Sequence, residues 1–594
     1  MKNLIKTALT LSITSALFAQ AAFAATYEVI DLGLVDTVKH TYGVEKNPNG
    51  QAIISGVSGY NFPVQFQYLD EDDFDDIVRY AEIYHDQIFE LTDIQDEDAL
   101  RAGTPVPNDL QWAINWLGGT KRGDTRYQKI SDTFVFLTDG VTSIPLTIFD
   151  QIIPGTSDYT RSTAEIPKGI TNDGWSFGSS SAPYMPLPPH TDDDDDTYVH
   201  WIPHDSTGDP INGFATRGWV SFDGTSIIEV TPLEASYGGL SAVNDINANR
   251  VAVGTSSVSL NPQILEDMLD DDDRGCNDPD YVGDGENVSY EVCIFSYKAR
   301  LFFSNAVKWS VNDDGSGVVA TDLGTGIINP DPEDERPFTS AATGINDSGV
   351  IVGYSNFWWD YDETPSRTER VGSFAAVFKD DQVIDFTDRD DYFESRALDI
   401  ANTGLFTGYM YAFINGKART KFFYANATDD VITPIFPEDF FKGSASTGFA
   451  INETGFIVGE GEVETFNDNG STPRRRHGFL YDINTDTFSD INSFLTCESQ
   501  YTVVEARDIN DANEILATAF VKQDKRNAVG EVIVIDGETI TEDVLRAVYL
   551  VPIEGEIEDC SEIEEKTERK GASFGVFAFL SLIPLMLFRR RKFI

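Results

Sequence analysis

Short apolar runs, each bounded by polar turn residues, recur along most of the chain and predict β-strands rather than helices. The clearest run, Val350-Ile351-Val352, follows the turn Asn346-Asp347-Ser348-Gly349. Because Gly is favoured where a hairpin turn needs a positive φ, Gly349 is expected in the left-handed conformation. Each such phrase therefore predicts two antiparallel strands joined by a tight turn.

The phrase follows the frame Ile-Asn-x-x-Gly-x-x-x-Gly and is repeated. Its copies begin at Ile170, Ile246, Ile345, Ile400, Ile451 and Ile509, and a worn seventh copy is Asn47-Pro48-Asn49-Gly50. In the last copy Asn513 replaces the first Gly, as expected if that position needs a positive φ. In the second copy Arg250 holds this position after Asn249, which indicates a turn shifted by one residue.

A second hairpin follows each phrase, so each module contains four short strands in a meander. The third strands are expected at 133–136, 218–220, 306–309, 375–378, 422–424, 478–481 and 532–535. The repeat predicts an all-β fold, a β-propeller of about seven four-stranded blades over residues 25–554. Residues 27–33 form a lone strand that could pair with the last blade and close the ring. A stacked β-solenoid is the alternative, although its coils are usually shorter than these modules.

Three long insertions interrupt the modules at 57–132, 181–216 and 257–304. All three fall between the second and third strands of a module, which places them on one face of a propeller. Since binding sites concentrate on loops held by a rigid scaffold, function is expected on this loop-rich, acidic face. Within the first insertion, residues 72–91 have the apolar spacing of an amphipathic helix, which is expected to pack on the propeller as a cap.

The phrase Gly344-Ile345-Asn346-Asp347, its following Val-Gly, the Ala-x-Val-Phe strand at 375–378 and a strand ending near Asp-Leu resemble the HAF-type extracellular repeat. The whole chain resembles an exported bacterial family of unknown function built on that repeat. The resemblance implies a propeller-like fold and a secreted or surface location. It implies no activity and no catalytic residues.

Both ends of the chain carry address signals. Residues 1–24 have the charged start, apolar run and Ala22-Phe23-Ala24 cleavage site of a signal peptide. Residues 555–570 form a charged stalk, and 571–594 contain an apolar run at 572–588 followed by Arg589-Arg590-Arg591. This tail predicts a transmembrane helix that anchors an exported protein in the cell envelope, with the propeller periplasmic or at the cell surface. It resembles GlyGly-type sorting tails, but Ala572 stands where the second Gly belongs, so a simple anchor is the alternative.

The charge is strongly acidic, with 98 acidic against 43 basic residues and a formal net charge of −55. Nucleic acid is therefore excluded as a partner, and cations are favoured. The carboxylate runs at 192–196 and 270–273 suit Ca²⁺, which prefers oxygen ligands, although no complete EF-hand loop occurs; solvated loops are the alternative. The chain has four cysteines. In an oxidising compartment they predict two disulfides, and Cys276–Cys293 with Cys497–Cys560 is the favoured pairing.

Two groups of candidate ligand-binding residues lie in the insertions and loops. A metal site could combine His190, His200 and His204 with Asp192, Asp194 and Asp196, and a second could use Asp271 and Asp273; surface or packing roles are the alternative. An exposed aromatic set suited to a glycan or a protein partner comprises Trp201, Phe357, Trp358, Trp359 and Tyr361. Burial beneath their own loops is the alternative for these rings.

No hydrolase elbow, zinc-protease, phosphate-loop or dinucleotide motif occurs, so an enzyme is not favoured, and no catalytic residue can be named. The preferred hypothesis is an exported binding or adhesion module that holds a glycan or a protein at the cell surface, with Ca²⁺ as a possible cofactor. A polysaccharide hydrolase or lyase and a structural envelope protein without a small ligand remain alternatives, because propellers serve all three purposes.

Overall fold

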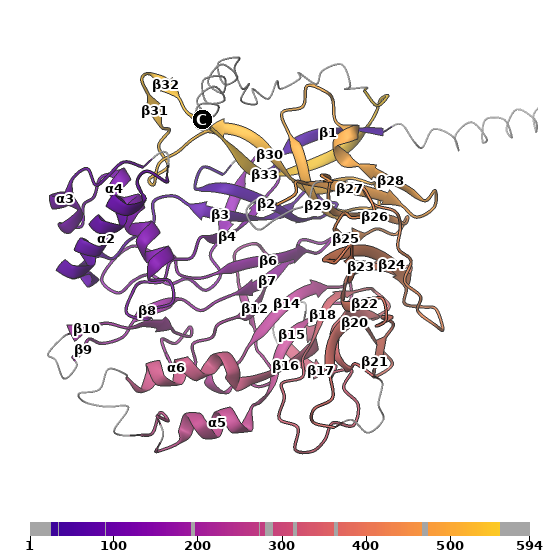
Figure 1. Ribbon diagram of the computed structural model, residues 1–594, viewed down its shortest axis with the longest axis horizontal. Coiled ribbons are helices and arrows are strands. Elements are labelled where there is room, and N and C mark those ends of the chain that lie inside the picture. The colour runs from indigo at the N-terminus through magenta and orange to yellow at the C-terminus, as the bar shows by residue number, and fades with distance from the viewer. Residues whose placement is uncertain are drawn as a thin grey trace, which may run out of the picture.

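A computed structural model describes residues 25–558, except 34, 89–90, 192–196, 273, 279–288, 313–317, 361–365 and 466–472. It is a seven-bladed β-propeller (Figure 1). The blades, with strands given from the centre outward, are as follows. Blade 1 is β2 (Val38–Lys46), β3 (Ala52–Gly59), β4 (Thr133–Thr138) and β5 (Ser143–Leu146). Blade 2 is β6 (Glu165–Ile170), β7 (Ser176–Ser180), β12 (Arg217–Ser221) and β13 (Ile228–Val230). Blade 3 is β14 (Ser241–Ile246), β15 (Val251–Leu260), β16 (Phe302–Val311) and β17 (Val318–Asp322).

The remaining blades follow the same order. Blade 4 is β18 (Ser340–Ile345), β19 (Ile351–Trp358), β20 (Val371–Lys379) and β21 (Gln382–Asp385). Blade 5 is β22 (Tyr392–Ile400), β23 (Leu405–Ile414) and β24 (Lys417–Asn426), with a bridge from Tyr424 to Ile435 at its outer edge. Blade 6 is β25 (Ser446–Ile451), β26 (Phe456–Glu462), β27 (Arg476–Asp482) and β28 (Thr487–Asp490). Blade 7 is β29 (Thr502–Ile509), β30 (Ile515–Asp524), β33 (Thr541–Glu554) and β1 (Ala25–Asp31).

The ring closes through blade 7, which combines both ends of the propeller. Strand β1 pairs antiparallel with β33, so that Tyr27 lies opposite Pro552 and Val29 opposite Leu550. The predicted lone N-terminal strand therefore closes the ring, as the sequence indicated. A closed ring leaves only short outer edges exposed, which is how repeated β-modules avoid open sheets.

One strand prediction was wrong. Residues 532–535 are not the third strand of blade 7, because that strand is β33. Instead, β31 (Val534–Ile535) and β32 (Glu538–Thr539) form a small hairpin in the connection from β30 to β33. The hairpin signal was real, but Val534 and Ile535 are 57% and 48% exposed, whereas Val544, Val548 and Leu550 of β33 are buried. We call residues 525–540, which carry this hairpin, the arm.

The repeated turns have the predicted backbone conformation. Gly349 has φ 83°, and Asn513, which replaces Gly in the last copy, has φ 60°. Arg250 has φ 63° and holds the same position in its own copy, so the expected one-residue shift of that turn was wrong. Its guanidinium lies 4.0 Å over the Trp175 ring and pairs with Asp173 in the neighbouring blade, contacts that offset the cost of a left-handed non-Gly residue.

The Asn of the repeat phrase links adjacent blades. The Asn452 carbonyl oxygen accepts from the backbone of Thr454 at 3.2 Å and Phe456 at 2.9 Å within its own turn. Its amide donates to the backbone oxygen of Asn510 in the next blade at 2.9 Å. Asn247 reaches the oxygen of Asn346 in the same way, at 3.0 Å. The phrase is therefore first of all a structural signature of blade docking.

Replacing Asn452 by alanine is expected to lower the free energy of unfolding by about 1–3 kcal/mol, because buried backbone groups lose their partners. Asn452 is 4% exposed. Chemical denaturation of the variant measures the loss. Asn484 lies in an exposed turn of the same blade, and its change to alanine should alter stability by less than about 0.5 kcal/mol. Equal effects of the two substitutions would contradict the linking role of Asn452.

All seven innermost strands carry a β-bulge at the same place, two residues before the Ile position of the repeat phrase. A bulge leaves one residue unpaired and disrupts the ladder locally. The unpaired residues line a central channel of about 730 Å³; they are Val44, Lys168, Asn244, Thr343, Leu398, Phe449 and Arg507. The backbone N–H groups that follow the bulges then need other acceptors.

Four carboxylates supply those acceptors. Asp245 accepts from Ile246 in its own blade and from Ile345 in the next, both at 2.7 Å. Asp399 does the same for Ile400 and Ile451, both at 2.8 Å. Asp508 accepts from Ile509 and from Lys46, and Glu45 accepts from Ile170 at 2.8 Å.

These carboxylates occupy alternate blades, and the blades between them carry Gly169, Gly344 and Ala450 at the equivalent position. Because the ring has an odd number of blades, carboxylates in every second blade must meet at one junction. This junction is between blades 7 and 1, where Asp508 and Glu45 lie in adjacent blades. Since Asp508 already serves Lys46, the longer Glu45 side chain is left to reach only the next blade. We call Glu45, Asp245, Asp399 and Asp508 the carboxylate ring.

The insertions gather on one side of the propeller (Figure 1). The first holds the short helices η1 (Phe66–Tyr68) and η2 (Trp116–Thr120), and helices α2 (Glu71–Tyr84), α3 (Glu97–Arg101) and α4 (Pro107–Asn115). The second holds β8 (Tyr184–Pro186), β9 (His190–Thr191), β10 (Thr197–Tyr198) and β11 (Trp201–Pro203). The third holds α5 (Pro262–Leu269) and α6 (Tyr290–Leu301); η3 (Ser236–Gly238) and η4 (Ile491–Phe494) lie between strands.

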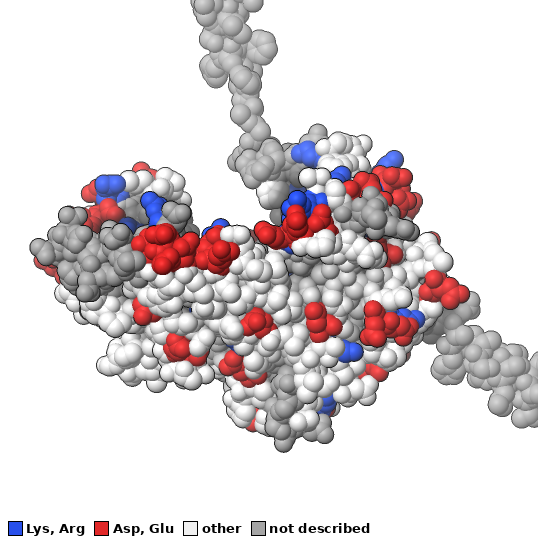
Figure 2. All heavy atoms as spheres, turned by 90° about the horizontal axis from the view of Figure 1, so that it is seen from below, with Lys and Arg blue, Asp and Glu red and all other residues white. Residues whose placement is uncertain are grey.

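The third insertion is joined by the disulfide Cys276–Cys293, which confirms that part of the predicted pairing. Cys497 is also disulfide-bonded, and Cys560 lies outside the described residues. The predicted signal peptide and membrane anchor lie outside them as well. In the described part of the chain, no helix is long and apolar enough to cross a membrane. Figure 2 shows acidic side chains scattered over the surface seen from below, with fewer basic ones.

Candidate ligand pocket

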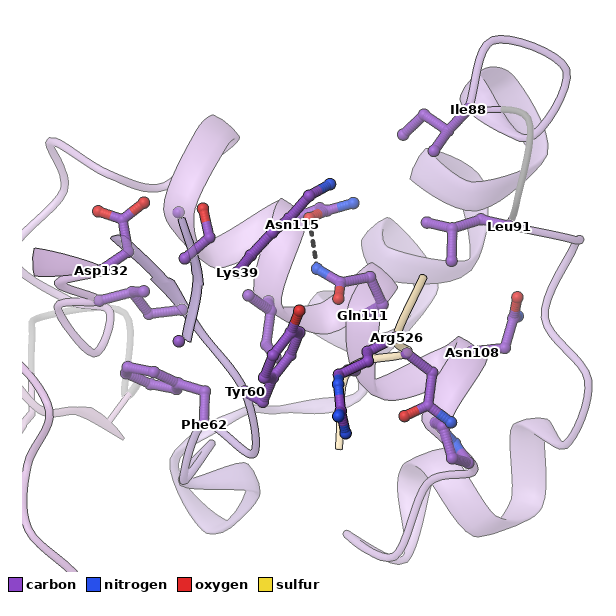
Figure 3. Close-up of a pocket in the computed structure, with 18 of the residues that line it drawn as sticks. Lys39, Tyr60, Phe62, Ile88, Leu91, Asn108, Gln111, Asn115, Asp132 and Arg526 are labelled. Atoms are coloured by element: carbon purple, nitrogen blue, oxygen red, sulfur yellow. Dashed lines mark hydrogen bonds between the residues drawn. The ribbon is translucent and has the colours of Figure 1, made fainter. Parts of the chain in front are cut away.

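A cavity of about 860 Å³ lies between the first insertion and the arm (Figure 3). Lys39 of β2, Phe134 of β4, and Tyr60, which follows the end of β3, lie on its floor. Helix α4 forms one wall and residues 525–533 of the arm form the opposite wall. The cavity thus joins a connection of blade 1 to the same connection of blade 7, on the side where the insertions gather. Its volume is in the range of small-molecule sites.

The wall formed by α4 is held by its own hydrophobic core. Phe74, Ile77, Ala81, Trp112 and Trp116 are buried together, each 5% exposed or less. The Trp112 indole donates to the backbone oxygen of Thr92 at 2.8 Å. The cap helix α2 ends at Tyr84, earlier than the pattern indicated, and begins with a capping box between Asp70 and Asp73. A rigid helical layer therefore presents the polar side of α4 to the cavity.

Amide and hydroxyl groups line the middle of the cavity. The Gln111 amide donates to the side-chain oxygen of Asn115 at 2.9 Å (Figure 3), which leaves the Gln111 oxygen and the Asn115 amide for other partners. The Tyr60 hydroxyl is buried and makes no hydrogen bond to any described residue. Burial raises the pKa of Tyr60, so the hydroxyl keeps its proton and can donate. Such convergent donors and acceptors beside Phe62, Tyr80 and Phe134 suit a ligand with several hydroxyl groups.

Four basic side chains, Lys39, Arg161, Lys525 and Arg526, line the cavity. Lys39 and Lys525 both contact Glu542, at 2.7 and 3.5 Å. Arg526 reaches Asp36 at 3.2 Å, and Arg161 lies 5.0 Å from the centre of the Phe134 ring. Asp132 is the acidic residue of the lining. This part of the loop-rich side is therefore basic, in contrast to the acidic face expected from the overall charge.

The predicted histidine site does not form a metal centre among the described residues. His200 is 6% exposed and its Nδ1 lies 2.8 Å from Thr125 Oγ1. His204 is 8% exposed and its Nδ1 lies 2.9 Å from the oxygen of Ile202. Burial lowers the pKa of His204, as expected for a neutral packing histidine. The His190 side chain, Asp192, Asp194 and Asp196 lie outside the described side chains.

The predicted calcium ligands do not form a metal site among the described residues. Asp271 is exposed, and Asp273 lies outside the described residues. Where the structure describes the chain, no group of three or more His, Cys, Asp or Glu side chains is arranged to hold a metal ion. A calcium site in these runs stays a prediction.

The prediction of an exposed aromatic set was wrong for the rings that are buried. Trp201, Phe357 and Trp358 are 2%, 6% and 4% exposed. The Trp358 indole donates to the oxygen of Ile328 at 2.8 Å. The centre of the Trp359 ring lies 5.6 Å from that of the Phe374 ring, and the Arg370 guanidinium lies 3.3 Å over the Trp359 ring. Large rings fill the space beneath loops because burying them stabilises a loop that has little other core. Tyr361 lies outside the described residues.

Sequence reasoning missed the residues of the cavity, and little in the sequence could have revealed them. Lys39, Tyr60, Asn115, Arg161 and Arg526 are spread over most of the chain length and belong to no motif. The one available signal was positional. The first insertion and residues 525–540 occupy the same connection in adjacent blades, once residues 541–554 are recognised as the third strand of blade 7.

The structure therefore defines a seven-bladed β-propeller with a ligand-sized cavity between two of its insertions. A family model described as "Protein of unknown function (DUF3466)" matches residues 4–591, so the chain belongs to this family. None of the curated proteins matches it.

Two solved structures are similar to this chain at low identity. A protein of unknown function from Dyadobacter fermentans DSM 18053 is 8% identical, with 89% of this chain and 99% of that chain covered and a TM-score of 0.31. TolB from Acinetobacter baumannii is 10% identical, with 90% and 98% covered and a TM-score of 0.26. The propeller assignment rests on the strand pairing described above.

Proposed function

We propose that this protein is an exported binding module that holds a saccharide in the cavity between α4 and the arm. The observation that supports this proposal is the lining itself. It contains the amide groups of Gln111 and Asn115, the Tyr60 hydroxyl, which has no partner among the described residues, and apolar ring surface from Phe62 and Tyr80. Hydroxyl-rich ligands need paired donors and acceptors, and their C–H faces pack on aromatic rings. The cavity offers both within one space.

The experiment that tests this proposal is saturation-transfer NMR on the purified full-length chain with a panel of neutral and acidic oligosaccharides. We expect at least one saccharide to bind, and Tyr60→Ala to weaken that binding about tenfold, because a buried hydroxyl and its ring surface are lost together. Phe413 is 70% exposed at a distant hairpin, so Phe413→Ala serves as the matched aromatic control. Saccharide binding that survives Tyr60→Ala unchanged would place the ligand elsewhere.

The cellular location of the protein is also part of the proposal. The signal peptide at 1–24, the anchor at 572–588 and the sorting-tail resemblance support export and retention in the cell envelope, and the HAF-type repeat supports a surface role. Fractionation of cells that express the full chain tests this location. A calcium-dependent rise in melting temperature would support a calcium role for the acidic runs, since ligands that bind only the native state stabilise it.

The two alternatives predict different outcomes of the same saccharide panel. A hydrolase or lyase would shorten an oligosaccharide during the measurement. A structural envelope protein would bind no member of the panel. A binding module returns the saccharide intact, which is the result that we expect.

A further inference from the structure

The charge of the cavity differs from that of the chain as a whole. The chain has 98 acidic and 43 basic residues, yet the lining contains Lys39, Arg161, Lys525 and Arg526 against Asp132. Lys39 comes from β2, whereas Lys525 and Arg526 come from the arm, and Figure 3 shows Lys39 and Arg526 beside the same space. Because Lys39 and Lys525 both contact Glu542, these basic groups gather on one side of the cavity. A concave site lined by one sign of charge attracts ligands of the opposite sign.

Two carboxylates outside the lining contact these basic groups. Lys39 and Lys525 both contact Glu542. Arg526 donates from Nη1 to the oxygen of Gly530 at 2.7 Å and from Nη2 to Asp36 at 3.2 Å. Asp36 is 92% exposed, and exposed ion pairs contribute little, so Nη2 can exchange Asp36 for a ligand at small cost. Arg161 lies over the Phe134 ring, and its guanidinium makes no hydrogen bond to another described side chain or backbone oxygen, so its N–H groups can act on a ligand.

Hydrogen-bonding groups stand next to these charges. The Tyr60 hydroxyl has no partner among the described residues, and Gln111 and Asn115 each keep one polar atom beyond the bond between them. A ligand that fills the cavity therefore meets hydroxyl-binding groups on the α4 side and charge-binding groups on the side of β2 and the arm.

We infer that the ligand is an acidic saccharide whose carboxylate is bound by Arg526 and Lys39 and whose hydroxyl groups face Tyr60, Gln111 and Asn115. This inference rests on the proposed function and specifies its ligand class. A guanidinium and a carboxylate form two parallel charge-assisted hydrogen bonds, which makes Arg526 the side chain that fixes the orientation of the ligand.

The probe pair that tests the inference is trigalacturonate and its fully methyl-esterified form, which have the same rings and hydroxyl groups but differ in charge. Calorimetric titration of the full-length chain should show trigalacturonate binding at least tenfold more tightly than the ester, and the difference should shrink as salt is raised. Equal affinity for both forms would overturn the inference and leave the proposed function intact. Binding of neither form, together with a negative panel of neutral oligosaccharides, would overturn both.

Substitutions of Arg526 test whether this side chain causes the preference for the charged saccharide. Arg526→Gln should lower the affinity for trigalacturonate about tenfold and leave that for the ester nearly unchanged, whereas Arg526→Lys should recover part of the loss. Arg367 is 54% exposed and pairs with Glu333 at 3.2 Å, so Arg367→Gln is the matched control and should change neither affinity. Melting temperatures of all variants show that each is folded, and an unchanged trigalacturonate affinity in folded Arg526→Gln would contradict the assignment.

Discussion

Replacing Asp245 by alanine is expected to destabilise the propeller by about 2–6 kcal/mol. The reason is that one carboxylate satisfies two backbone N–H groups, those of Ile246 and Ile345, at 2.7 Å each, and each unsatisfied buried group costs about 1–3 kcal/mol. The two groups lie in adjacent blades, so the substitution weakens a blade and its junction together. A loss of this size is a large share of the roughly 5–15 kcal/mol that stabilises a folded protein.

Urea denaturation of the Asp245→Ala, Asp245→Asn and unsubstituted chains measures the effect. Asparagine keeps one acceptor oxygen, so about half of the loss should be recovered. Asp430 is exposed, and Asp430→Asn should lie within about 0.5 kcal/mol of the unsubstituted chain. If Asp245→Ala were equally close, water in the channel would satisfy these N–H groups and the carboxylate ring would not hold the blades.

Stability is expected to rise as the pH falls from neutral toward mildly acidic. Burial raises the pKa of Asp245 to about 7, of Asp399 to about 6 and of Asp508 to about 7. Burial, followed by the charge of Asp508, also raises the pKa of Glu45 well above its usual value. A raised folded-state pKa means that the group contributes its full stability below the unfolded pKa, about 4, and loses it as the pH rises to the folded value.

The slope is at most about 1.4 kcal/mol per pH unit for each group, and less here because these side chains line an accessible channel. We therefore expect the melting temperature to be several degrees higher at pH 5.5 than at pH 8. Asp245→Asn removes one titrating group and should give a shallower profile, whereas Asp430→Asn should reproduce the original one. A melting temperature that falls steadily between pH 8 and pH 5.5 would contradict the raised pKa values.

Much of the fold could be predicted because the repeat phrase encodes it locally. A positive φ at Gly349 and the docking role of Asn452 are both requirements of one short turn, so most copies carry the Asn and most carry the Gly. Thr171 and Ala401 replace the Asn in two copies, and Arg250 and Asn513 replace the Gly in two others. The third strand of blade 7 could not be predicted in the same way. Val534-Ile535 and Asp536-Gly537 form a good local hairpin, and only pairing with β30 and β1, far apart in sequence, selects Thr541–Glu554 instead.

The sequence contains the pattern of the carboxylate ring, but the ring was not predicted from it. An acid precedes the Ile position in alternate copies, as in Asp245 and Asp399, and glycine or alanine stands there in the others. The signal becomes meaningful only with the bulge that frees the following N–H group, which is a property of the backbone. The number of acidic residues was also a poor guide to ligands. Carboxylates such as Asp245 accept hydrogen bonds from the backbone of the propeller and need not bind a cation.

The site could be predicted far less well than the fold. Phe357 and Trp358 were predicted as ligand-binding residues because they are large and adjacent. They are buried instead, because a loop of that size needs them as its own core. The cavity instead depends on single residues such as Tyr60 and Arg526, which the ring closure brings together from opposite ends of the chain. No local pattern marks residues whose proximity is created by closing a propeller.

A crystal structure of the full-length chain with trigalacturonate would locate the ligand directly. We expect saccharide density between α4 and the arm, with a carboxylate beside Arg526 and hydroxyl groups within hydrogen-bonding distance of Tyr60 or Asn115. Density at another surface, or an empty cavity at a concentration that saturates binding in solution, would contradict it.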